Sequence, residues 1–242
     1  MTRRALQGTL RSQVLIADLA GLLLVLAAAW AATRWLGVGA VYPLTAAATF
    51  GAGALVMARF VAIHHPFETF GAANQVTTLR AALIALIVGL VFEPVTRGVA
   101  ATATAMAVIV SALDGVDGWL ARRTQMSSAF GARFDVESDS LFVMTMSVLV
   151  WRHDKAGVWI LAGGFFRYAF VAAGWILPWM AGRLRPTNRA RTVAACHMLG
   201  LTIALAPIVP AWFSTAGLAA TLTLLAWSFA VDVGRLWRGE TT

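Results

Sequence analysis

The fold is decided by the stretch 192–231, which reads TVAACHMLGLTIALAPIVPAWFSTAGLAATLTLLAWSFAV. These 40 residues contain no Asp, Glu, Lys or Arg. A helix needs roughly 20 apolar residues to cross a bilayer, so the stretch is long enough for two passes around a turn at Pro207 and Pro210. A second uncharged block, of 24 residues, runs over 35–58. Both blocks predict membrane-spanning helices.

The composition of the whole chain agrees with lipid as its solvent. The 242 residues are 60% hydrophobic and only 12% charged, whereas about a quarter of the residues of a soluble domain are charged. Helices satisfy their own backbone hydrogen bonds inside a bilayer, and the alternating pattern of a membrane barrel is absent from the sequence. We therefore expect an all-α, polytopic membrane helical bundle.

The apolar blocks predict eight membrane spans and two domains. The expected spans are 14–33, 39–60, 76–96, 98–120, 132–151, 157–180, 192–209 and 213–234. The segment 61–75 is typical of a linker. We therefore expect a two-span N-terminal extension over 1–65 and a six-span body over 66–242.

The basic residues predict the orientation of these spans. The formal net charge is +8, but the basic residues are dispersed at the ends of the apolar blocks, so we expect contact with lipid headgroups and no nucleic acid. Only Arg34, Arg97, Arg152 and Lys155 fall on the outer side if the N-terminus lies in the cytoplasm. Fourteen arginines then lie inside, in agreement with the positive-inside rule: Arg3, Arg4, Arg11, Arg59, Arg80, Arg122, Arg123, Arg133, Arg183, Arg185, Arg189, Arg191, Arg235 and Arg238.

The acidic residues are concentrated in one short segment. Five of the eleven fall within 114–139, namely Asp114, Asp117, Asp135, Glu137 and Asp139. Residues three or four apart share one face of a helix, so Asp114 and Asp117 form one pair and Asp135 and Asp139 another, while Glu137 points elsewhere. The short connection 123–134 predicts antiparallel neighbouring helices whose carboxylate faces meet.

Carboxylates in this arrangement indicate a site for a hard divalent cation. All-oxygen ligands suit Mg²⁺ or Mn²⁺, and four carboxylates can hold two such ions, as in many enzymes of phosphoryl chemistry. The alternative is that Asp114 and Asp117 cap helices or pair with Arg122, Arg123 and Arg133. Four aspartates on two facing helices favour the metal site over that alternative.

The spacing of this segment resembles the signature of a known family. Asp114-x-x-Asp117-Gly118-x-x-Ala121-Arg122, eight residues, Gly131, three residues, Asp135, three residues and Asp139 match every position of the CDP-alcohol phosphotransferase signature. The resemblance covers roughly 70–235 and implies a body of six membrane helices. Asn74-x-x-Thr77-x-x-Arg80 also resembles the segment that opens the first helix of that family. The first two expected spans are additional to the family plan.

The resemblance implies transfer of a phospho-alcohol group from a CDP-alcohol to an acceptor hydroxyl, with release of CMP. It makes Asp114, Asp117, Asp135 and Asp139 the metal ligands, with Asp139 also the general base. It implies nucleotide contacts for Gly118, Ala121, Arg122 and Gly131. Asn74 and Thr77 either cap the third span or line the nucleotide pocket.

Recognition of the acceptor is the least determined part of this hypothesis. Arg167 lies well inside the sixth span, with 11 uncharged residues before it and 15 after it, and a charge at such depth indicates a functional site. An anionic acceptor is one partner for Arg167; a structural pairing with Asp232 or Asp18 is the other. Arg189, in the basic loop 183–191, is a second acceptor candidate or a topology residue.

These features favour CDP-diacylglycerol as the donor and an anionic acceptor, in phospholipid biosynthesis at the cytoplasmic face of a prokaryotic inner membrane. A CDP-aminoalcohol transferase acting on diacylglycerol is the main alternative. An aspartate-rich membrane prenyltransferase and a cation-binding transporter fit less well, since all four aspartates lie within 26 residues and no internal repeat is visible. Members of the family are often homodimers, and the sequence leaves that point open.

Overall fold

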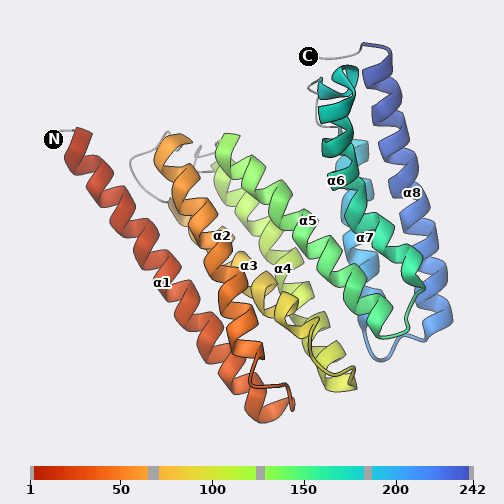
Figure 1. The fold of residues 1–242 in the computed structure, drawn as a ribbon, viewed down its shortest axis with the longest axis horizontal. Helices are drawn as coiled ribbons and strands as arrows, with labels where there is room; N and C mark the ends of the chain where they lie inside the picture. Colours follow the sequence, from red (N-terminus) through yellow and green to blue (C-terminus); the bar gives the residue numbers. More distant parts are fainter. Residues whose placement is uncertain (1–2, 65–70, 124–128, 183–186, 240–242) are drawn as a thin grey trace. The chain divides into compact units, whose positions relative to one another are not determined.

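The computed structural model describes the backbone of residues 3–64, 71–123, 129–182 and 187–239, and their side chains except at 3–11, 60–64, 71–73, 117–122, 129–134 and 181. Within these ranges the chain is helical and contains no strand. Eight α-helices follow one another along the chain (Figure 1): α1 (Arg3–Trp35), α2 (Tyr42–His64), α3 (Gly71–Leu90), α4 (Arg97–Arg123), α5 (Ala129–Arg152), α6 (Leu161–Ile176), α7 (Asn188–Leu205) and α8 (Ala211–Trp237). Two short 3₁₀ helices, η1 (Val158–Ile160) and η2 (Pro178–Ala181), flank α6. The expected all-α fold class is confirmed.

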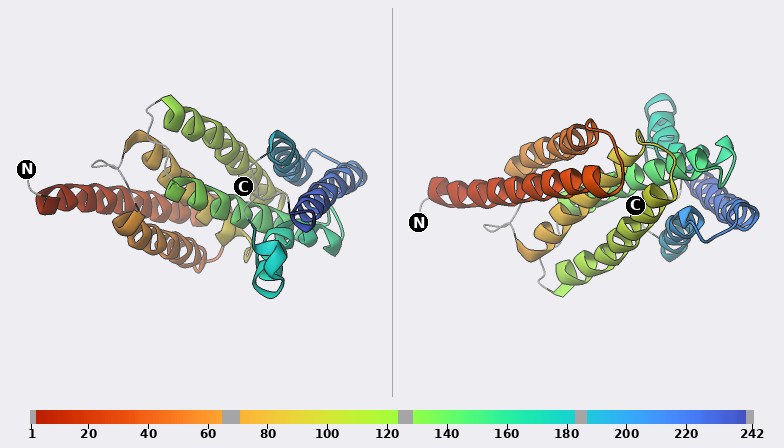
Figure 2. Two further views of the ribbon diagram at one scale, coloured as in Figure 1. Left: turned by 90° about the horizontal axis from the view of Figure 1, so that it is seen from above. Right: turned by 90° about the horizontal axis from the view of Figure 1, so that it is seen from below.

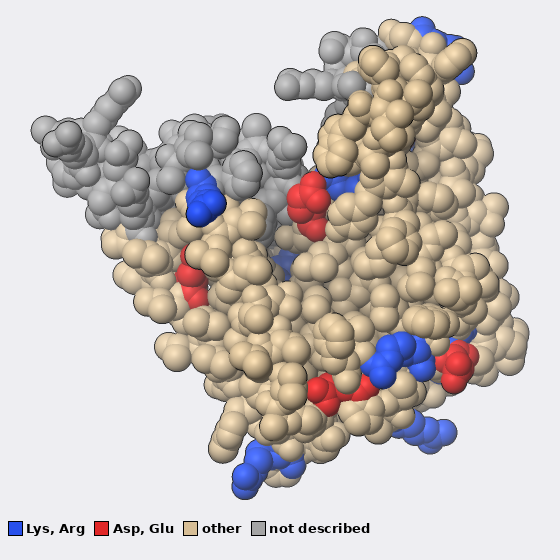
Figure 3. All heavy atoms as spheres, viewed as in Figure 1, with Lys and Arg blue, Asp and Glu red and all other residues tan. Residues whose placement is uncertain are grey.

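Several described helices have the length and composition of membrane spans. The segments Ser12–Trp35, Arg97–Val116, Val158–Ile176 and Ala211–Trp237 are long and apolar enough to cross a bilayer, and Asn74–Leu90 is a shorter apolar helix. Large apolar side chains cover the outside of the protein, and most described side chains on the face seen in Figure 3 are neither acidic nor basic. A soluble protein would not expose so much apolar surface. The chain is an integral membrane protein; the count of eight spans stays a prediction.

The helices form two compact units. The first comprises Met1–Pro94 with Ala105–Asp139, and therefore contains α1, α2, α3, most of α4 and the beginning of α5. The second comprises Val95–Thr104 with Ser140–Thr242 and contains the beginning of α4, the rest of α5, and α6, α7 and α8. The domains predicted from the sequence meet between residues 65 and 66. These two units divide the chain at other positions, and the predicted domains stay a prediction.

In the first unit, α1 and α2 form a hairpin that packs against α3 (Figure 2). The Tyr42 hydroxyl donates a hydrogen bond to the Leu86 carbonyl oxygen at 3.0 Å. A Cβ atom added to Gly89 would lie 2.7 Å from the Tyr42 ring, so only glycine allows this close approach. At the end of α3, the Glu93 carboxylate accepts a hydrogen bond from the Gly39 backbone N–H at 2.6 Å. The hairpin is thus fixed to α3 at several points.

In the second unit, α7 and α8 pack along each other, and α6 also contacts α8. His197 of α7 is 1% exposed, and its Nδ1 lies 3.1 Å from the Thr221 hydroxyl of α8. Gly163 of α6 lies against the same imidazole, since an added Cβ would be 2.5 Å from Nε2. His197 therefore belongs to the packing of α6, α7 and α8.

Two helix ends differ from the expected spans, each for a local reason. The sixth span was expected over 157–180, yet α6 ends at Ile176 because Pro178 restricts Leu177 to an extended conformation (φ −113°, ψ 100°). The third span was expected to reach residue 96, but α3 ends at Leu90, shortly before Pro94, which disfavours a helical conformation at Glu93. In both cases a proline follows the end of the helix, and the helix is shorter than the apolar stretch of sequence predicts.

Candidate active site

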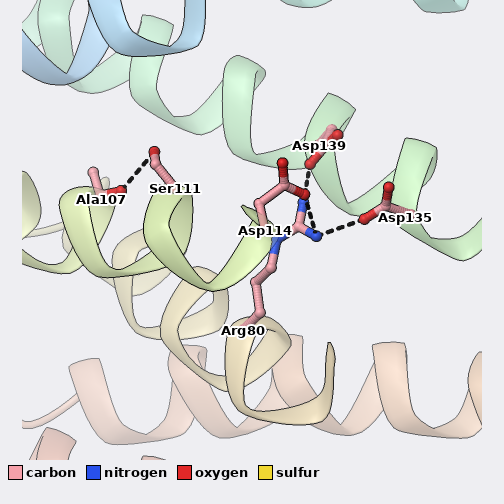
Figure 4. A network of polar contacts seen from close by, with 6 residues as sticks. All are labelled: Arg80, Ala107, Ser111, Asp114, Asp135 and Asp139. Atoms are coloured by element: carbon pink, nitrogen blue, oxygen red, sulfur yellow. Dashed lines mark hydrogen bonds and ion pairs between the residues drawn. The ribbon is translucent and has the colours of Figure 1, made fainter. Parts of the chain in front are cut away.

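Arg80 of α3 lies at the centre of a cluster of ion pairs (Figure 4). Its Nη1 is 2.8 Å from Asp114 Oδ1 and 2.5 Å from Asp135 Oδ1. Its Nη2 contacts Asp139 Oδ1. The Arg80 side chain is 1% exposed, whereas the three carboxylates are 31–40% exposed. One buried guanidinium thus holds three carboxylates at a partly accessible position.

Three helices contribute to this cluster, and all of its residues belong to the first unit. Asp114 comes from α4, and Asp135 and Asp139 lie one turn apart on α5. One oxygen from each carboxylate lies within 4.8 Å of the others. The meeting of carboxylates from two helices, expected from their spacing, is found for these three residues. Ser111, one turn before Asp114, bonds back to the Ala107 carbonyl at 2.9 Å and stays out of the cluster.

The cluster has an excess of negative charge. Three carboxylates contact one guanidinium, so these four side chains together carry more negative than positive charge. At an effective dielectric constant of about 20, two carboxylates 4.8 Å apart repel each other by about 3 kcal/mol. Hard oxygen donors at this spacing with excess negative charge are what a divalent cation such as Mg²⁺ requires. The residues present therefore fit a divalent metal ion.

Several of the expected site residues have side chains outside the described part of the structure. Helix α4 includes Asp117, Gly118, Ala121 and Arg122, and helix α5 includes Gly131. Their backbone is helical, and their roles as metal ligand or nucleotide contacts stay predictions.

Asn74 and Thr77 lie inside α3, which begins at Gly71. Both are half-buried, and the Asn74 carbonyl accepts a hydrogen bond from the Thr78 hydroxyl at 3.0 Å. A capping residue lies at the boundary of its helix, so the position of both residues disfavours that alternative. The other alternative, that Asn74 and Thr77 line the nucleotide pocket, stays a prediction. Thr77 is three residues before Arg80 and shares its side of the helix.

The candidates for acceptor binding, Arg167 and Arg189, belong to the second unit. Arg189 Nη2 lies 2.5 Å from Asp232 Oδ1, and the guanidinium lies over the Trp227 ring at 5.5 Å. Arg235 Nη1 approaches the same Asp232 oxygen at 3.9 Å. Arg167 is a half-buried residue of α6. Asp232 is thus paired with Arg189, and the roles considered for Arg167 and Arg189 stay predictions.

Arg80 has a role in this cluster that the sequence does not predict. The charge pattern places Arg80 at the cytoplasmic end of a span, whereas the structure buries the side chain among carboxylates. The signal was available, because Arg80 has 11 uncharged residues before it and 12 after it. The same signal marked Arg167, and a charge deep in an apolar helix indicates a functional site in both cases.

Carboxylate clusters that hold divalent ions recur in enzymes that act on phosphate esters, so the fold and the site fit a membrane enzyme of this class. The sequence comparisons give the family. The profile of the CDP-alcohol phosphatidyltransferase family matches residues 70–233, and the chain belongs to that family. It is therefore a transferase of phosphate-containing groups, with a CDP-alcohol as donor and a hydroxyl compound as acceptor.

A curated relative supports this assignment. The CDP-diacylglycerol–glycerol-3-phosphate 3-phosphatidyltransferase of Pseudomonas fluorescens is 34% identical over 140 residues, which cover 55% of this chain and 71% of the relative. No solved structure gives a significant match.

Proposed function

We propose that this chain transfers the phosphatidyl group of CDP-diacylglycerol to the hydroxyl of a small phosphorylated acceptor of the glycerol-3-phosphate class, with release of CMP. The family supplies the reaction class, and the name of the Pseudomonas relative supports this donor and this acceptor. Arg167 and the loop around Arg189 supply positive charge for an anionic acceptor.

The single observation that carries the proposal is the convergence of Asp114, Asp135 and Asp139 on one point. Their oxygens lie within 4.8 Å of one another although the residues come from two helices. A carboxylate in a membrane helix costs roughly 2.5–3.5 kcal/mol on insertion scales. Three such residues at one point favour a catalytic site over a structural arrangement.

Asp114, Asp117, Asp135 and Asp139 would hold one or two Mg²⁺ or Mn²⁺ ions. When bound, a divalent ion neutralises the diphosphate of the donor and the negative charge that develops on the leaving CMP. Asp139, 31% exposed, can reach a bound substrate from the accessible side of the cluster. We assign it the role of general base.

In the reaction, a bond forms between the acceptor oxygen and the phosphorus that carries the diacylglycerol group. The phosphoanhydride bond between that phosphorus and CMP breaks, and CMP leaves with the electron pair. Asp139 accepts the proton of the acceptor hydroxyl as the new bond forms. A correctly placed base contributes about 10²–10⁴-fold to such a step.

The nucleotide would lie against the part of α4 that follows Asp114. Gly118 and Ala121 leave room for close approach, and Arg122 offers a fork of donors to the diphosphate. Gly131 gives the same freedom at the start of α5. Asn74 and Thr77 on α3 would line the nucleotide pocket. The distribution of the arginines supports a position at the cytoplasmic face of a bacterial inner membrane.

An assay with purified protein tests the proposal. The protein in detergent, supplied with Mg²⁺, CDP-diacylglycerol and glycerol-3-phosphate, should release CMP and form a phosphatidyl product, identified by mass spectrometry. Inositol phosphate and serine serve as competing acceptors. Product formation only from a CDP-aminoalcohol and diacylglycerol would replace this proposal by its alternative, and no CMP release from any CDP-alcohol would refute it.

A further inference from the structure

Arg80 and a divalent cation require the same three carboxylates. Asp114, Asp135 and Asp139 are the described group that could hold a metal ion, and each of them contacts the Arg80 guanidinium. Magnesium lies about 2.0–2.1 Å from its oxygen ligands. A cation held by this group would therefore be close to the guanidinium, and the two positive charges would repel each other.

We propose that Arg80 is an internal counter-ion: it holds the three carboxylates together in the metal-free protein and competes with the divalent cation for them. The inference rests on the metal site of the proposed function. It assigns Arg80 a positioning role toward the metal site, which lowers the affinity for the ion while it keeps the site assembled.

The burial of Arg80 supports the first half of this role. At 1% exposure the guanidinium has little access to water, so the carboxylates must compensate its charge. The carboxylates in turn repel one another when no cation lies between them. Each side of the cluster thus requires the other in the metal-free protein.

The shape of the side chain supports the choice of arginine. A guanidinium presents five N–H donors in a fixed plane, and here two of its nitrogens contact three carboxylates on two helices. A lysine ammonium is a compact point charge that cannot span the same three oxygens as well. Arg80 can therefore join α3, α4 and α5 in a way that lysine cannot.

Replacement of Arg80 separates this role from a merely structural one. In Arg80→Gln the competing positive charge is absent, so the metal-free protein should be less stable and the divalent ion should bind more tightly. An arginine that served only to maintain the fold would have the opposite effect on the metal site, because its loss would disorder the carboxylates and weaken ion binding. The sign of the change in affinity decides between them.

The experiment measures Mn²⁺ binding to the full chain in detergent, by electron paramagnetic resonance of the free ion, with neither donor nor acceptor present. Arg80→Gln should bind Mn²⁺ about tenfold more tightly than the wild type, and Arg80→Lys should lie between the two. The matched control is Arg34→Gln, which removes the same charge from an exposed residue of α1 that lies over Trp30 at 5.7 Å. It should bind Mn²⁺ as the wild type does.

Thermal unfolding with and without Mn²⁺ completes the test. Arg80→Gln should melt at a lower temperature than the wild type without the ion and gain more from its addition. A variant that stays folded only with a divalent ion would support the proposal, since the ion then replaces the guanidinium. Folded Arg80→Gln that binds Mn²⁺ no more tightly than the wild type would overturn it.

The outcomes for this inference and for the proposed function are distinguishable. Tighter Mn²⁺ binding by Arg80→Gln, with no CMP release by the wild type, would sustain the counter-ion role and refute the reaction. CMP release by the wild type with unchanged Mn²⁺ affinity in Arg80→Gln would support the reaction and refute the counter-ion role. Absence of Mn²⁺ binding by both proteins would overturn the counter-ion role and the metal part of the reaction together.

Discussion

The two charged clusters of the chain are built with opposite balances. In the first unit, one arginine, Arg80, faces three aspartates. In the second unit, one aspartate, Asp232, faces the two arginines Arg189 and Arg235. Each arrangement leaves an excess charge in a protein that is otherwise largely uncharged.

The difference between them concerns what compensates the excess. Asp232 forms one close pair with Arg189, which also lies over the Trp227 ring, and Arg235 is farther away at 3.9 Å. The extra positive charge of this cluster interacts with the Trp227 ring and with the C-terminal end of α8. Around Arg80, three carboxylates contact one guanidinium, and their oxygens lie close enough together to hold a cation. The acidic cluster therefore has the donors that a divalent ion needs, whereas the basic one is compatible with a structural role.

Among the changes that test this difference between the clusters, removal of divalent ions should have the largest effect on CMP release. Chelation with EDTA should reduce CMP release to background, because the acidic cluster then lacks the charge that the diphosphate requires. Addition of Mg²⁺ or Mn²⁺ should restore it, while added K⁺ should not. Full activity in the chelated protein would contradict a divalent ion at the acidic cluster, and with it this difference between the two clusters.

The next largest effect is expected for Asp139→Asn. The substitution removes the general base and keeps the size of the side chain, so turnover should fall by about 10²–10⁴-fold. Binding of the CDP-alcohol should be largely retained. The matched control is Glu137→Gln, an exposed residue on the same turn of α5, which should keep most of its activity. Near-normal turnover of Asp139→Asn would rule out the base assignment.

Arg167→Ala tests whether the second unit recognises the acceptor. Loss of a charge-assisted hydrogen bond, worth about 1.5–3 kcal/mol, should raise the KM for an anionic acceptor about tenfold to a hundredfold. The KM for the donor, measured in the same variant, should change much less. A rise confined to the donor KM would contradict an acceptor role for Arg167.

The smallest effect is expected for Asp232→Asn. It weakens the pair with the partly buried Arg189, and we expect a loss of about 1–3 kcal/mol of unfolding free energy, measured by thermal unfolding in detergent. Arg235→Gln should cost less, about 0.2–1 kcal/mol, since its contact is long. An increased acceptor KM for Asp232→Asn at unchanged stability would show that the basic cluster takes part in acceptor binding.

Sequence patterns predicted much of this architecture because lipid imposes strict rules on helices. The uncharged stretch 192–231 indicated two helices around Pro207 and Pro210, and α7 ends at Leu205 while α8 begins at Ala211. The spacing of Asp135 and Asp139 placed both on one side of a helix, and the two contact the same guanidinium. Local periodicity alone was sufficient for these features.

The features that were missed depend on contacts between helices. Arg80 was counted among the residues at a membrane surface, because a count of positive charges does not distinguish a hydrated arginine from one that faces carboxylates on other helices. No pattern along one helix reports such a contact.

The hairpin of α1 and α2 has a consequence for the design of shortened proteins. It covers one side of α3, with Tyr42 bonded to Leu86 and Glu93 bonded to Gly39, and α3 also carries Arg80. A truncation that keeps only the family-matching residues 70–233 would leave that side of α3 bare and the Glu93 carboxylate without its Gly39 donor. Inactivity of such a fragment would thus report a damaged scaffold, and it would say nothing about whether the hairpin takes part in chemistry.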